Sequence, residues 1–160
     1  IITTGVVMLV AVAAVIVIWA LVKSKLQQQK RARFFRQQRY LEELRQLEPQ
    51  EFEEYLAALY EQLGYTAITT DFQGDHGIDV IIKKGGQTYA VQAKRYSKKN
   101  YVGEPEVRNF VGSYAHSHYA GGYFVTTSHF SKAALEWAKD RNINLIDGEA
   151  LERLMQQARK

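Results

Sequence analysis

The amino-acid sequence predicts an α/β domain with a mixed β-sheet flanked by helices, preceded by a transmembrane helix and a helical linker. Three observations lead to this prediction. Residues 1–22 are almost entirely apolar, residues 23–47 have the composition of a charged helix, and residues 48–160 alternate helical and strand patterns. The last segment has 113 residues, which is enough for a domain with its own hydrophobic core.

The N-terminal segment predicts a membrane anchor. Residues 5–22 form an uncharged run of 18 residues, which is long enough to cross a bilayer as a helix. A cleaved signal peptide would carry positive charge before its apolar region, whereas here Lys23, Lys25 and five further basic residues follow it. The positive-inside rule then places the folded domain in the cytoplasm. The sequence thus predicts a single-pass protein of the cell (inner) membrane with a cytoplasmic domain.

The linker, residues 23–47, contains no Gly or Pro and is rich in helix-forming residues. Leu41, Leu44 and Leu47 recur at three-residue spacing, and Phe34 lies one heptad before Leu41. This pattern is typical of a short coiled coil or of a stalk that lies on the domain. The basic half of the linker favours attraction to anionic lipid, with DNA capture as the alternative.

Composition excludes some classes of function. The chain has no cysteine, so disulfide frameworks and thiolate zinc sites are excluded. The net charge of +4 does not identify a DNA-binding domain, because the linker carries 8 basic and 2 acidic residues whereas residues 48–160 carry 13 basic and 15 acidic ones. The basic excess therefore lies beside the apolar segment.

The folded domain begins with a helix between Pro49, which suits a first helical turn, and Gly64, which is typical of a helix end. Its apolar positions recur at helical spacing: Phe52, Leu56, Leu59 and Leu63. Strands are predicted over residues 65–70, 78–84 and 88–96. Gly85-Gly86, between the last two, is a two-residue hairpin signal.

The second half of the domain alternates helices and strands. Helices begin at Pro105, after Ser131 as N-cap and after Asp147 as N-cap, and the second of them carries Leu135 and Ala138 on its predicted buried face. Apolar strands are predicted over residues 122–127 and 143–146. The order α-β-β-β-α-β-α-β-α predicts a mixed sheet with helices on both faces.

The predicted hairpin brings polar side chains together. A turn centred on Gly85-Gly86 pairs Lys84 with Gln87, and counting outward places Asp79 opposite Gln92. Because side chains alternate between the faces of a strand, Gln92 and Lys94 share a face with Asp79.

A helical wheel separates two neighbouring glutamates on the first helix of the domain. With Phe52 at the centre of the apolar stripe, Glu53 falls at its edge and can face the sheet, whereas Glu54 falls almost opposite. We therefore expect Glu53 to face the sheet and Glu54 to face water.

A carboxylate beside another oxygen donor is a suitable site for a hard cation such as Mg²⁺. A nearby lysine can orient an attacking water and stabilise a phosphorane-like transition state. The alternative is a surface hairpin with ordinary polar residues, and the spacing Asp-then-Gln-x-Lys alone favours that alternative.

A wider set of motifs favours the catalytic interpretation. Residues 48–160 resemble the catalytic domain of the Mrr-like restriction endonucleases, which belong to the PD-(D/E)xK nuclease superfamily. The resemblance covers the whole segment in order, in the runs Phe52-Glu53, Leu63-Gly64-Tyr65, Gly74-Asp75-His76-Gly77-Ile78-Asp79-Val80, Val91-Gln92-Ala93-Lys94-Arg95-Tyr96, Val107-Arg108, Phe110-Val111-Gly112, Gly122-Tyr123-Phe124-Val125-Thr126-Thr127, Phe130-Ser131-Lys132-Ala133-Ala134-Leu135 and Ile146-Asp147-Gly148.

The resemblance implies a role for individual residues. Asp79 matches the metal-binding aspartate, Gln92 stands where many members have a second carboxylate, and Lys94 matches the catalytic lysine. Glu53 matches the glutamate of the first helix. The implied metal is Mg²⁺, with Mn²⁺ as a substitute, and its implied ligands are Asp79, Gln92, Glu53 and the Ala93 carbonyl.

The residues that follow Lys94 are the predicted DNA contacts. Arg95, Lys98 and Lys99 lie beside Tyr96 in the densest basic cluster of the domain, and a solvated loop is the alternative. Ser128-His129 has the residue types of a nucleophile and its base, but no acid is placed to orient the histidine, so we interpret it as non-catalytic.

The resemblance implies an Mg²⁺-dependent endodeoxyribonuclease that restricts foreign or modified DNA, and the apolar N-terminal segment predicts that it is anchored in the membrane. The implied partners are DNA, the membrane through the N-terminal helix, and a second copy of the chain for double-strand cleavage. The alternatives are a non-catalytic DNA- or nucleotide-sensing domain at the membrane and a structural protein that assembles partners. The joint presence of Glu53, Asp79, Gln92 and Lys94 argues against both.

Overall fold

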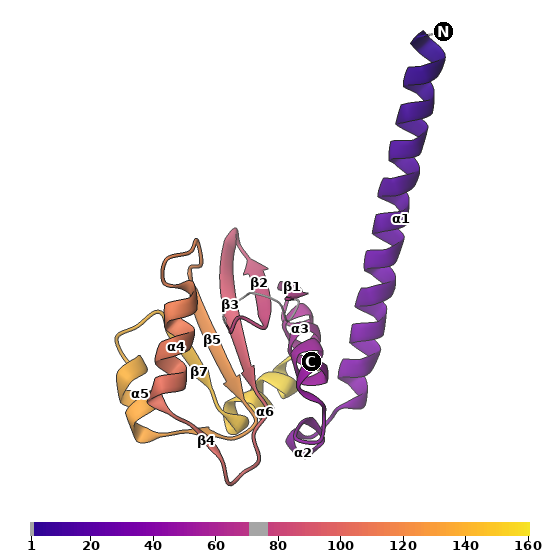
Figure 1. Ribbon diagram of the computed structural model, residues 1–160. Coiled ribbons are helices and arrows are strands. Elements are labelled where there is room, and N and C mark those ends of the chain that lie inside the picture. The colour runs from indigo at the N-terminus through magenta and orange to yellow at the C-terminus, as the bar shows by residue number, and fades with distance from the viewer. Residues whose placement is uncertain (1, 71–76) are drawn as a thin grey trace.

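The computed structural model describes residues 2–70 and 77–160, so residues 74–76 of the glycine-rich motif lie outside the described part. A long N-terminal helix projects from an α/β domain (Figure 1). The helices are α1 (Ile2–Gln37), α2 (Leu41–Leu44), α3 (Pro49–Gln62), α4 (Glu104–Tyr114), α5 (Lys132–Ala138) and α6 (Gly148–Gln157). The strands are β1 (Thr66–Thr69), β2 (Val80–Lys84), β3 (Gln87–Lys94), β4 (Tyr101–Val102), β5 (Gly121–Thr126), β6 (His129–Phe130) and β7 (Ile143–Ile146).

The main sheet is mixed, as the sequence predicts. Its strand order is β1-β2-β3-β5-β7, with antiparallel pairing from β1 to β3 and parallel pairing from β3 to β7. A second, two-stranded sheet pairs β4 with β6 in parallel, and the sequence analysis did not predict these two short strands.

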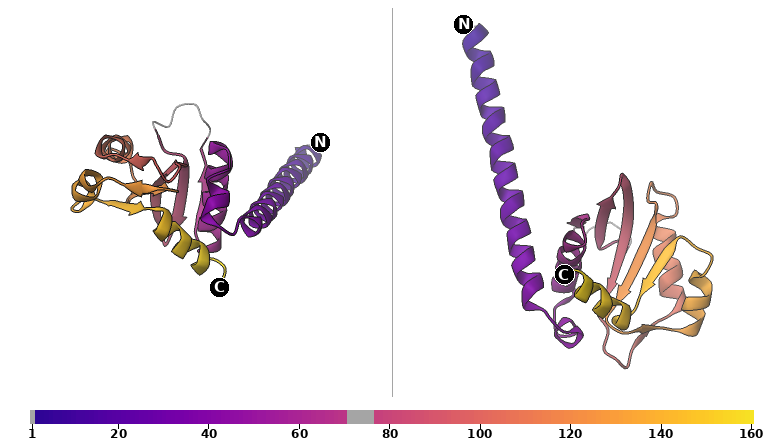
Figure 2. Two further views of the ribbon diagram at one scale, coloured as in Figure 1. Left: turned by 90° about the horizontal axis from the view of Figure 1, so that it is seen from below. Right: turned by 180° about the vertical axis from the view of Figure 1, so that it is seen from behind.

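Helices cover both faces of the main sheet (Figure 2). On one face, α3 and α6 pack on Val80, Ile82 and Val91, and their buried side chains form one continuous core. On the other face, α4 and α5 pack on a second core that includes Ala90 and Phe124. The predicted fold class is therefore confirmed.

The linker lies on the domain. The C-terminal part of α1 packs against α3, and α2 follows it. Four apolar side chains of this segment are buried in the same core as α3: Phe35, Leu41, Leu44 and Leu47. The boundary predicted after residue 47 stays a prediction, but side chains on both sides of it share one core. Of the two interpretations of the linker, the structure shows the stalk.

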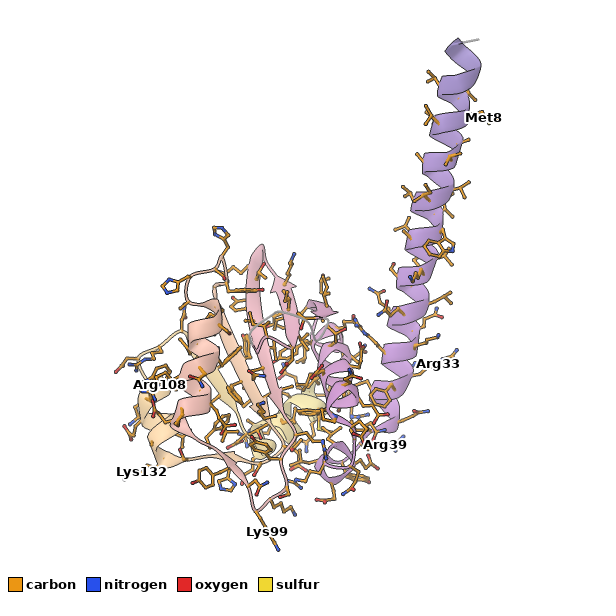
Figure 3. All side chains as sticks on the ribbon, in the orientation of Figure 1. Met8, Arg33, Arg39, Lys99, Arg108 and Lys132 are labelled. Carbon is orange, nitrogen blue, oxygen red and sulfur yellow. The ribbon has the colours of Figure 1, made fainter. Side chains whose placement is uncertain are left out.

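The apolar half of α1 is exposed. Among the described residues, α1 is a helix long and apolar enough to cross a membrane, and none of its apolar window is buried by the rest of the protein. The side chains from Val6 to Val22 point outward around the helix (Figure 3). This segment is therefore not a core helix of the domain.

A buried arginine fastens α1 to the domain. The Arg31 guanidinium donates to Glu54 Oε2 at 2.7 Å, to Glu61 Oε1 at 3.1 Å and to Thr69 Oγ1 at 3.2 Å. Thr69 Oγ1 in turn donates to Glu54 Oε1 at 2.8 Å. The prediction that Glu54 faces water is only partly right: its side chain is 41% exposed, but it also contacts α1, which the wheel did not include.

The predicted face of α5 is also partly wrong. Leu135 is exposed at 49%, whereas Ala134 and Ala138 are buried. The helix has 7 residues and packs through small side chains close to the sheet, so its contact face is narrower than the apolar pattern indicates.

Replacing Leu44, which is fully buried in the core, tests whether the linker belongs to the cooperative fold. Leu44→Ala should lower the free energy of unfolding by about 2–5 kcal/mol, because it removes buried methyl groups and leaves a cavity. Gln46→Ala, at an exposed neighbouring position, is the matched control. Chemical unfolding of the full chain in detergent measures both, and equal stability of the two variants would show that α2 contributes nothing to the core.

Candidate active site

The β2–β3 hairpin has the predicted register. Lys84 pairs with Gln87 and Val80 with Val91, so the next position outward brings Asp79 beside Gln92. The Asp79 backbone continues the ladder, because its N–H donates to the Val91 carbonyl at 2.8 Å.

The Asp79 carboxylate is held by the facing strand. Its Oδ2 accepts a hydrogen bond from Gln92 Nε2 at 2.7 Å and one from the Ala93 N–H at 2.7 Å. Within the described part of the chain, both bonds use the same oxygen, which leaves Oδ1 for another partner. The predicted convergence of Asp79 and Gln92 is therefore present in the structure.

Gly77 makes room for this arrangement. Its φ of +96° lies in the left-handed region, and a Cβ at this position would lie 2.8 Å from Gln92 Oε1. An L side chain here would strain the backbone and displace the amide. The glycine thus leaves the space into which Gln92 Oε1 points.

Glu53 joins the site from α3, as the helical wheel predicts. Burial, the nearby Asp79 carboxylate and the neighbouring Glu54 raise the pKa of Glu53 to about 7, and Lys94 opposes this rise. Burial also raises the pKa of Asp79, against its hydrogen bonds from Ala93 and Gln92 and the charge of Lys94. The charges of Asp79 and Lys94 are therefore close enough to Glu53 to affect its pKa.

The site fits a hard divalent cation. It offers two half-buried carboxylates that repel each other and the Gln92 amide oxygen, and oxygen atoms are the ligands that such a cation prefers. No group of three or more His, Cys, Asp or Glu side chains that could hold a metal occurs among the described residues.

The backbone of Lys94 is fixed by residues that the sequence analysis did not single out. Lys94 pairs with Thr126 of the parallel strand β5, and its carbonyl accepts from Thr126 Oγ1 at 2.8 Å. The same carbonyl accepts from the Thr127 N–H at 3.3 Å. Both threonines are buried, and a pair of hydroxyl residues ending a predicted apolar strand is the signal that could have indicated them.

The four predicted DNA contacts divide into two pairs. Arg95 Nη1 donates to the Arg45 carbonyl at 2.8 Å, and Tyr96 donates from its hydroxyl to Glu106 Oε1 at 2.9 Å, so both have partners within the protein. Lys98 and Lys99 are exposed, with Lys98 Nζ 4.0 Å from Glu42 Oε2. Lys99 lies at the tip of the loop that follows β3 (Figure 3).

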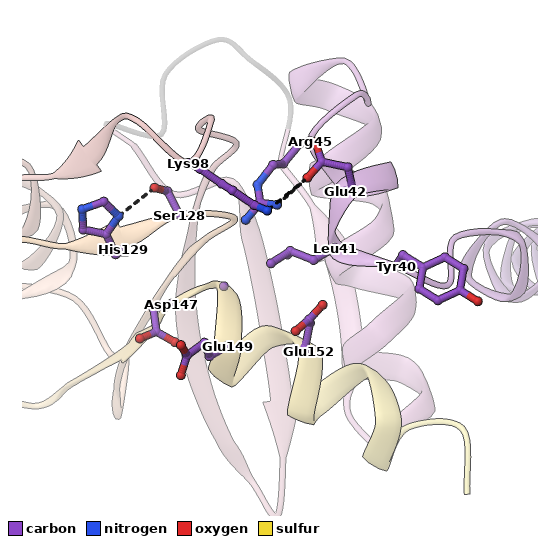
Figure 4. Close-up of a pocket in the computed structure, with 11 residues that line it drawn as sticks. Tyr40, Leu41, Glu42, Arg45, Lys98, Ser128, His129, Asp147, Glu149 and Glu152 are labelled. Atoms are coloured by element: carbon purple, nitrogen blue, oxygen red, sulfur yellow. Dashed lines mark hydrogen bonds and ion pairs between the residues drawn. The ribbon is translucent and has the colours of Figure 1, made fainter.

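A pocket of about 430 Å³ lies between α2 and the N-terminal end of α6 (Figure 4). Lys98 and Glu42 lie together on one part of its lining, and the acidic Asp147, Glu149 and Glu152 lie on another. None of the four predicted catalytic residues lines it. The pocket is therefore separate from the Asp79 site.

The raised pKa of Glu53 predicts a pH-dependent stability. Without divalent cations, the folded state keeps the Glu53 proton up to about pH 7, whereas the unfolded chain releases it near 4.5, so stability should fall as pH rises between these values. Glu53→Gln should remove this fall and make the protein more stable than the parent at pH 8. The gain should be on the order of 1 kcal/mol, since solvent screens a partly exposed carboxylate.

Thermal unfolding from pH 5 to pH 8 in a chelating buffer measures this effect. Glu152→Gln, which removes an exposed carboxylate on α6, is the control and should keep the profile of the parent. Identical profiles for Glu53→Gln and the parent would show that Glu53 has an ordinary pKa.

Comparisons with known proteins agree with this geometry. The restriction endonuclease family model (Mrr_cat) matches residues 44–155. The type IV methyl-directed restriction enzyme EcoKMrr of Escherichia coli (strain K12) is 39% identical over 124 residues, which cover 72% of this chain and 40% of that enzyme. The chain thus matches less than half of the length of this curated relative.

Two solved structures share the fold. The DNA modification-dependent restriction endonuclease AspBHI is 22% identical, with a TM-score of 0.60 over 84% of this chain and 36% of that chain. The protein of unknown function AF1548 is 22% identical, with a TM-score of 0.58 over 66% of this chain and 64% of that chain. The fold, the hairpin that carries Asp79 and the family match lead to one conclusion: this chain belongs to the restriction endonuclease family, through an Mrr-type catalytic domain.

Proposed function

We propose that this protein is a membrane-anchored endodeoxyribonuclease that hydrolyses phosphodiester bonds of DNA with Mg²⁺. The observation that carries the proposal is the convergence of Asp79 and Gln92 on the hairpin, with Glu53 and Lys94 close enough to shift the ionisation of the site. Membership of the restriction endonuclease family supports the same reaction.

The metal ligands in this proposal are Asp79, Glu53, Gln92 and the Ala93 carbonyl. A bound Mg²⁺, or Mn²⁺ in its place, would supply Lewis-acid stabilisation of the charge that develops on the phosphate. The raised pKa values of Glu53 and Asp79 support the assignment, because two crowded carboxylates gain most from a nearby cation. Gln92 adds no charge, which favours weaker metal binding than three carboxylates would give.

Lys94 is the proposed catalytic cation. Its ammonium group, close to both carboxylates, can orient the attacking water and donate a hydrogen bond to a non-bridging phosphate oxygen. Water then forms the new bond to phosphorus while the bond to the leaving sugar oxygen breaks. The bonds that Thr126 and Thr127 make to the Lys94 carbonyl hold the backbone of this residue in place.

The exposed Lys98 and Lys99 are the proposed phosphate contacts. They follow the strand that ends at Lys94, and contacts to the DNA backbone position a nuclease without reading sequence. Arg95 and Tyr96 were also predicted as DNA contacts from the sequence. In this proposal they support the lysines indirectly, because their side chains bind the end of β3 to the end of α2 and to α4.

The biological role in this proposal is restriction of foreign or modified DNA. The support is the similarity to EcoKMrr, whose name describes a methyl-directed enzyme. Cleavage of both strands would use two copies of the domain.

Membrane anchoring rests on α1. The exposed apolar half of this helix can cross a bilayer, and seven basic residues follow it before the first acidic residue. The domain would then lie in the cytoplasm, where DNA is available.

Replacing Asp79 or Lys94 tests the reaction. Asp79→Asn and Lys94→Ala should each slow cleavage of plasmid DNA by about 100-fold or more, because each removes a group that stabilises transition-state charge. Mg²⁺ should raise the melting temperature of Lys94→Ala but no longer that of Asp79→Asn, which has lost a metal ligand.

Two exposed positions provide the matched controls. Asp140→Asn and Lys160→Ala remove the same charges far from the hairpin and should cleave like the parent. Cleavage at the parent rate by both Asp79→Asn and Lys94→Ala would overturn the assignment. A non-catalytic DNA- or nucleotide-sensing domain would then be the better description.

A topology reporter tests the anchoring. A fluorescent or enzymatic reporter that works only in the cytoplasm, fused after Lys160, should be active, because basic residues flank the C-terminal side of the span. The same reporter fused before Ile1 should be inactive. Activity of the N-terminal fusion alone would reverse the proposed orientation.

A further inference from the structure

Two exposed aromatic rings lie side by side on the small second sheet. Tyr101 of β4 pairs with His129 of β6, and their ring centroids are 6.0 Å apart at an angle of 39°. Tyr101 is 57% exposed, and His129 is also exposed. The rings therefore stand on the surface, where they bury little area in the core.

The backbone beneath the rings is rigid. The next residues in each strand, Val102 and Phe130, are buried, and the Ser131 N–H donates to the Val102 carbonyl at 2.9 Å. Ser128 Oγ donates to the Asn100 carbonyl, which ties the two strands together at their other end. The backbone positions of the two ring-bearing residues are thus fixed by contacts within the protein.

The ring pair is continuous with the catalytic strand. Tyr96, just after β3, donates its N–H to Thr127 Oγ1 at 2.9 Å, and its carbonyl accepts from the same hydroxyl at 2.7 Å. These bonds join the segment before β4 to the segment before β6. The strands β4 and β6, which carry the rings, therefore follow β3 and β5, the two strands that position the Lys94 backbone.

Exposed lysines flank the rings. Lys99 and Tyr101 line a shallow hollow of about 300 Å³, and Lys98 and His129 line the larger pocket described above (Figure 4). The lining of the larger pocket at the N-terminal end of α6 is acidic, with Asp147, Glu149 and Glu152, so that side repels a phosphate chain. A polyanion can approach the rings from the lysine side.

We propose that Tyr101 and His129 form a stacking platform for an unpaired nucleobase of the DNA strand whose phosphates contact Lys98 and Lys99. The proposal rests on the proposed function, since it takes DNA as the ligand. Aromatic side chains beside a line of cationic groups are the common means of binding single-stranded nucleic acid, because every base has a face that can stack. An acidic peptide would satisfy the lysines but would not need two neighbouring exposed rings.

This assignment gives Ser128-His129 a role that is not nucleophilic catalysis. His129 Nδ1 lies 3.2 Å from Ser128 Oγ, but that hydroxyl is directed to the Asn100 carbonyl. The contact holds the orientation of the ring and leaves its face for a ligand.

Binding to two matched oligonucleotides tests the proposal. The probes are a fluorescent single-stranded oligothymidylate and an abasic strand with the same number of phosphates, and the full chain in detergent is titrated in a chelating buffer so that no cleavage occurs. The parent should bind the base-containing strand more tightly than the abasic one. Tyr101→Ala and His129→Ala should each weaken binding of the base-containing strand about 10-fold and leave binding of the abasic strand unchanged.

The controls separate stacking from charge and from misfolding. Tyr101→Phe keeps the ring and should bind like the parent. His118→Ala, which removes an exposed histidine from the turn after α4, should also bind both strands like the parent. Lys99→Ala should weaken binding of both strands and reduce the dependence of affinity on salt. If Tyr101→Ala binds both strands like the parent, the platform is refuted.

Plasmid cleavage by the parent, measured separately with Mg²⁺, distinguishes this proposal from the proposed function. Cleavage without base-dependent binding would refute the platform and leave the nuclease assignment. Base-dependent binding without cleavage would support the platform on a non-catalytic domain.

Discussion

The site depends on the register of the β2–β3 hairpin. Gly85 and Gly86 have φ values of +58° and +77°, which a two-residue hairpin turn requires and which other residues rarely adopt. This turn sets the pairing of Lys84 with Gln87 and thereby brings Asp79 beside Gln92. A shift of the β2–β3 register by one residue would move Gln92 and Lys94 to the face opposite Asp79, so the three side chains would no longer meet.

Two further elements complete the site, and both are held by contacts outside the hairpin. The helix α3 carries Glu53, and Arg31 of α1 fastens this helix and β1 through Glu54, Glu61 and Thr69. Similarly, the end of β3 is fixed by Thr126 and Thr127 of β5 and by contacts between Arg95 and the Arg45 carbonyl. The segment next to the apolar half of α1 therefore belongs structurally to the catalytic domain.

The sequence predicted the parts of the site that depend on local geometry. The position of Asp79 opposite Gln92 follows from the Gly85-Gly86 turn and from the alternation of side chains along a strand. The side of α3 on which Glu53 lies follows from the helical repeat. The environment of Glu54 was predicted only in part because it also depends on α1, which is distant in sequence. The small β4–β6 sheet was missed for the same reason: two-residue strands carry no periodic signal, and their pairing joins segments that are far apart along the chain.

The neutral Gln92 can donate a hydrogen bond to Asp79, which a third carboxylate in its ionised form could not do. An amide can donate a hydrogen bond, and Gln92 Nε2 uses this to stabilise the ionised form of Asp79. An ionised glutamate at the same position could only accept, so Asp79 would lose a donor and gain a neighbouring negative charge. In a site where burial already raises the pKa of both Glu53 and Asp79, that change would favour protonation of one carboxylate before a cation arrives. Gln92 thus favours the ionised form of Asp79 and orients its carboxylate, at the cost of one fewer negative charge to attract the metal.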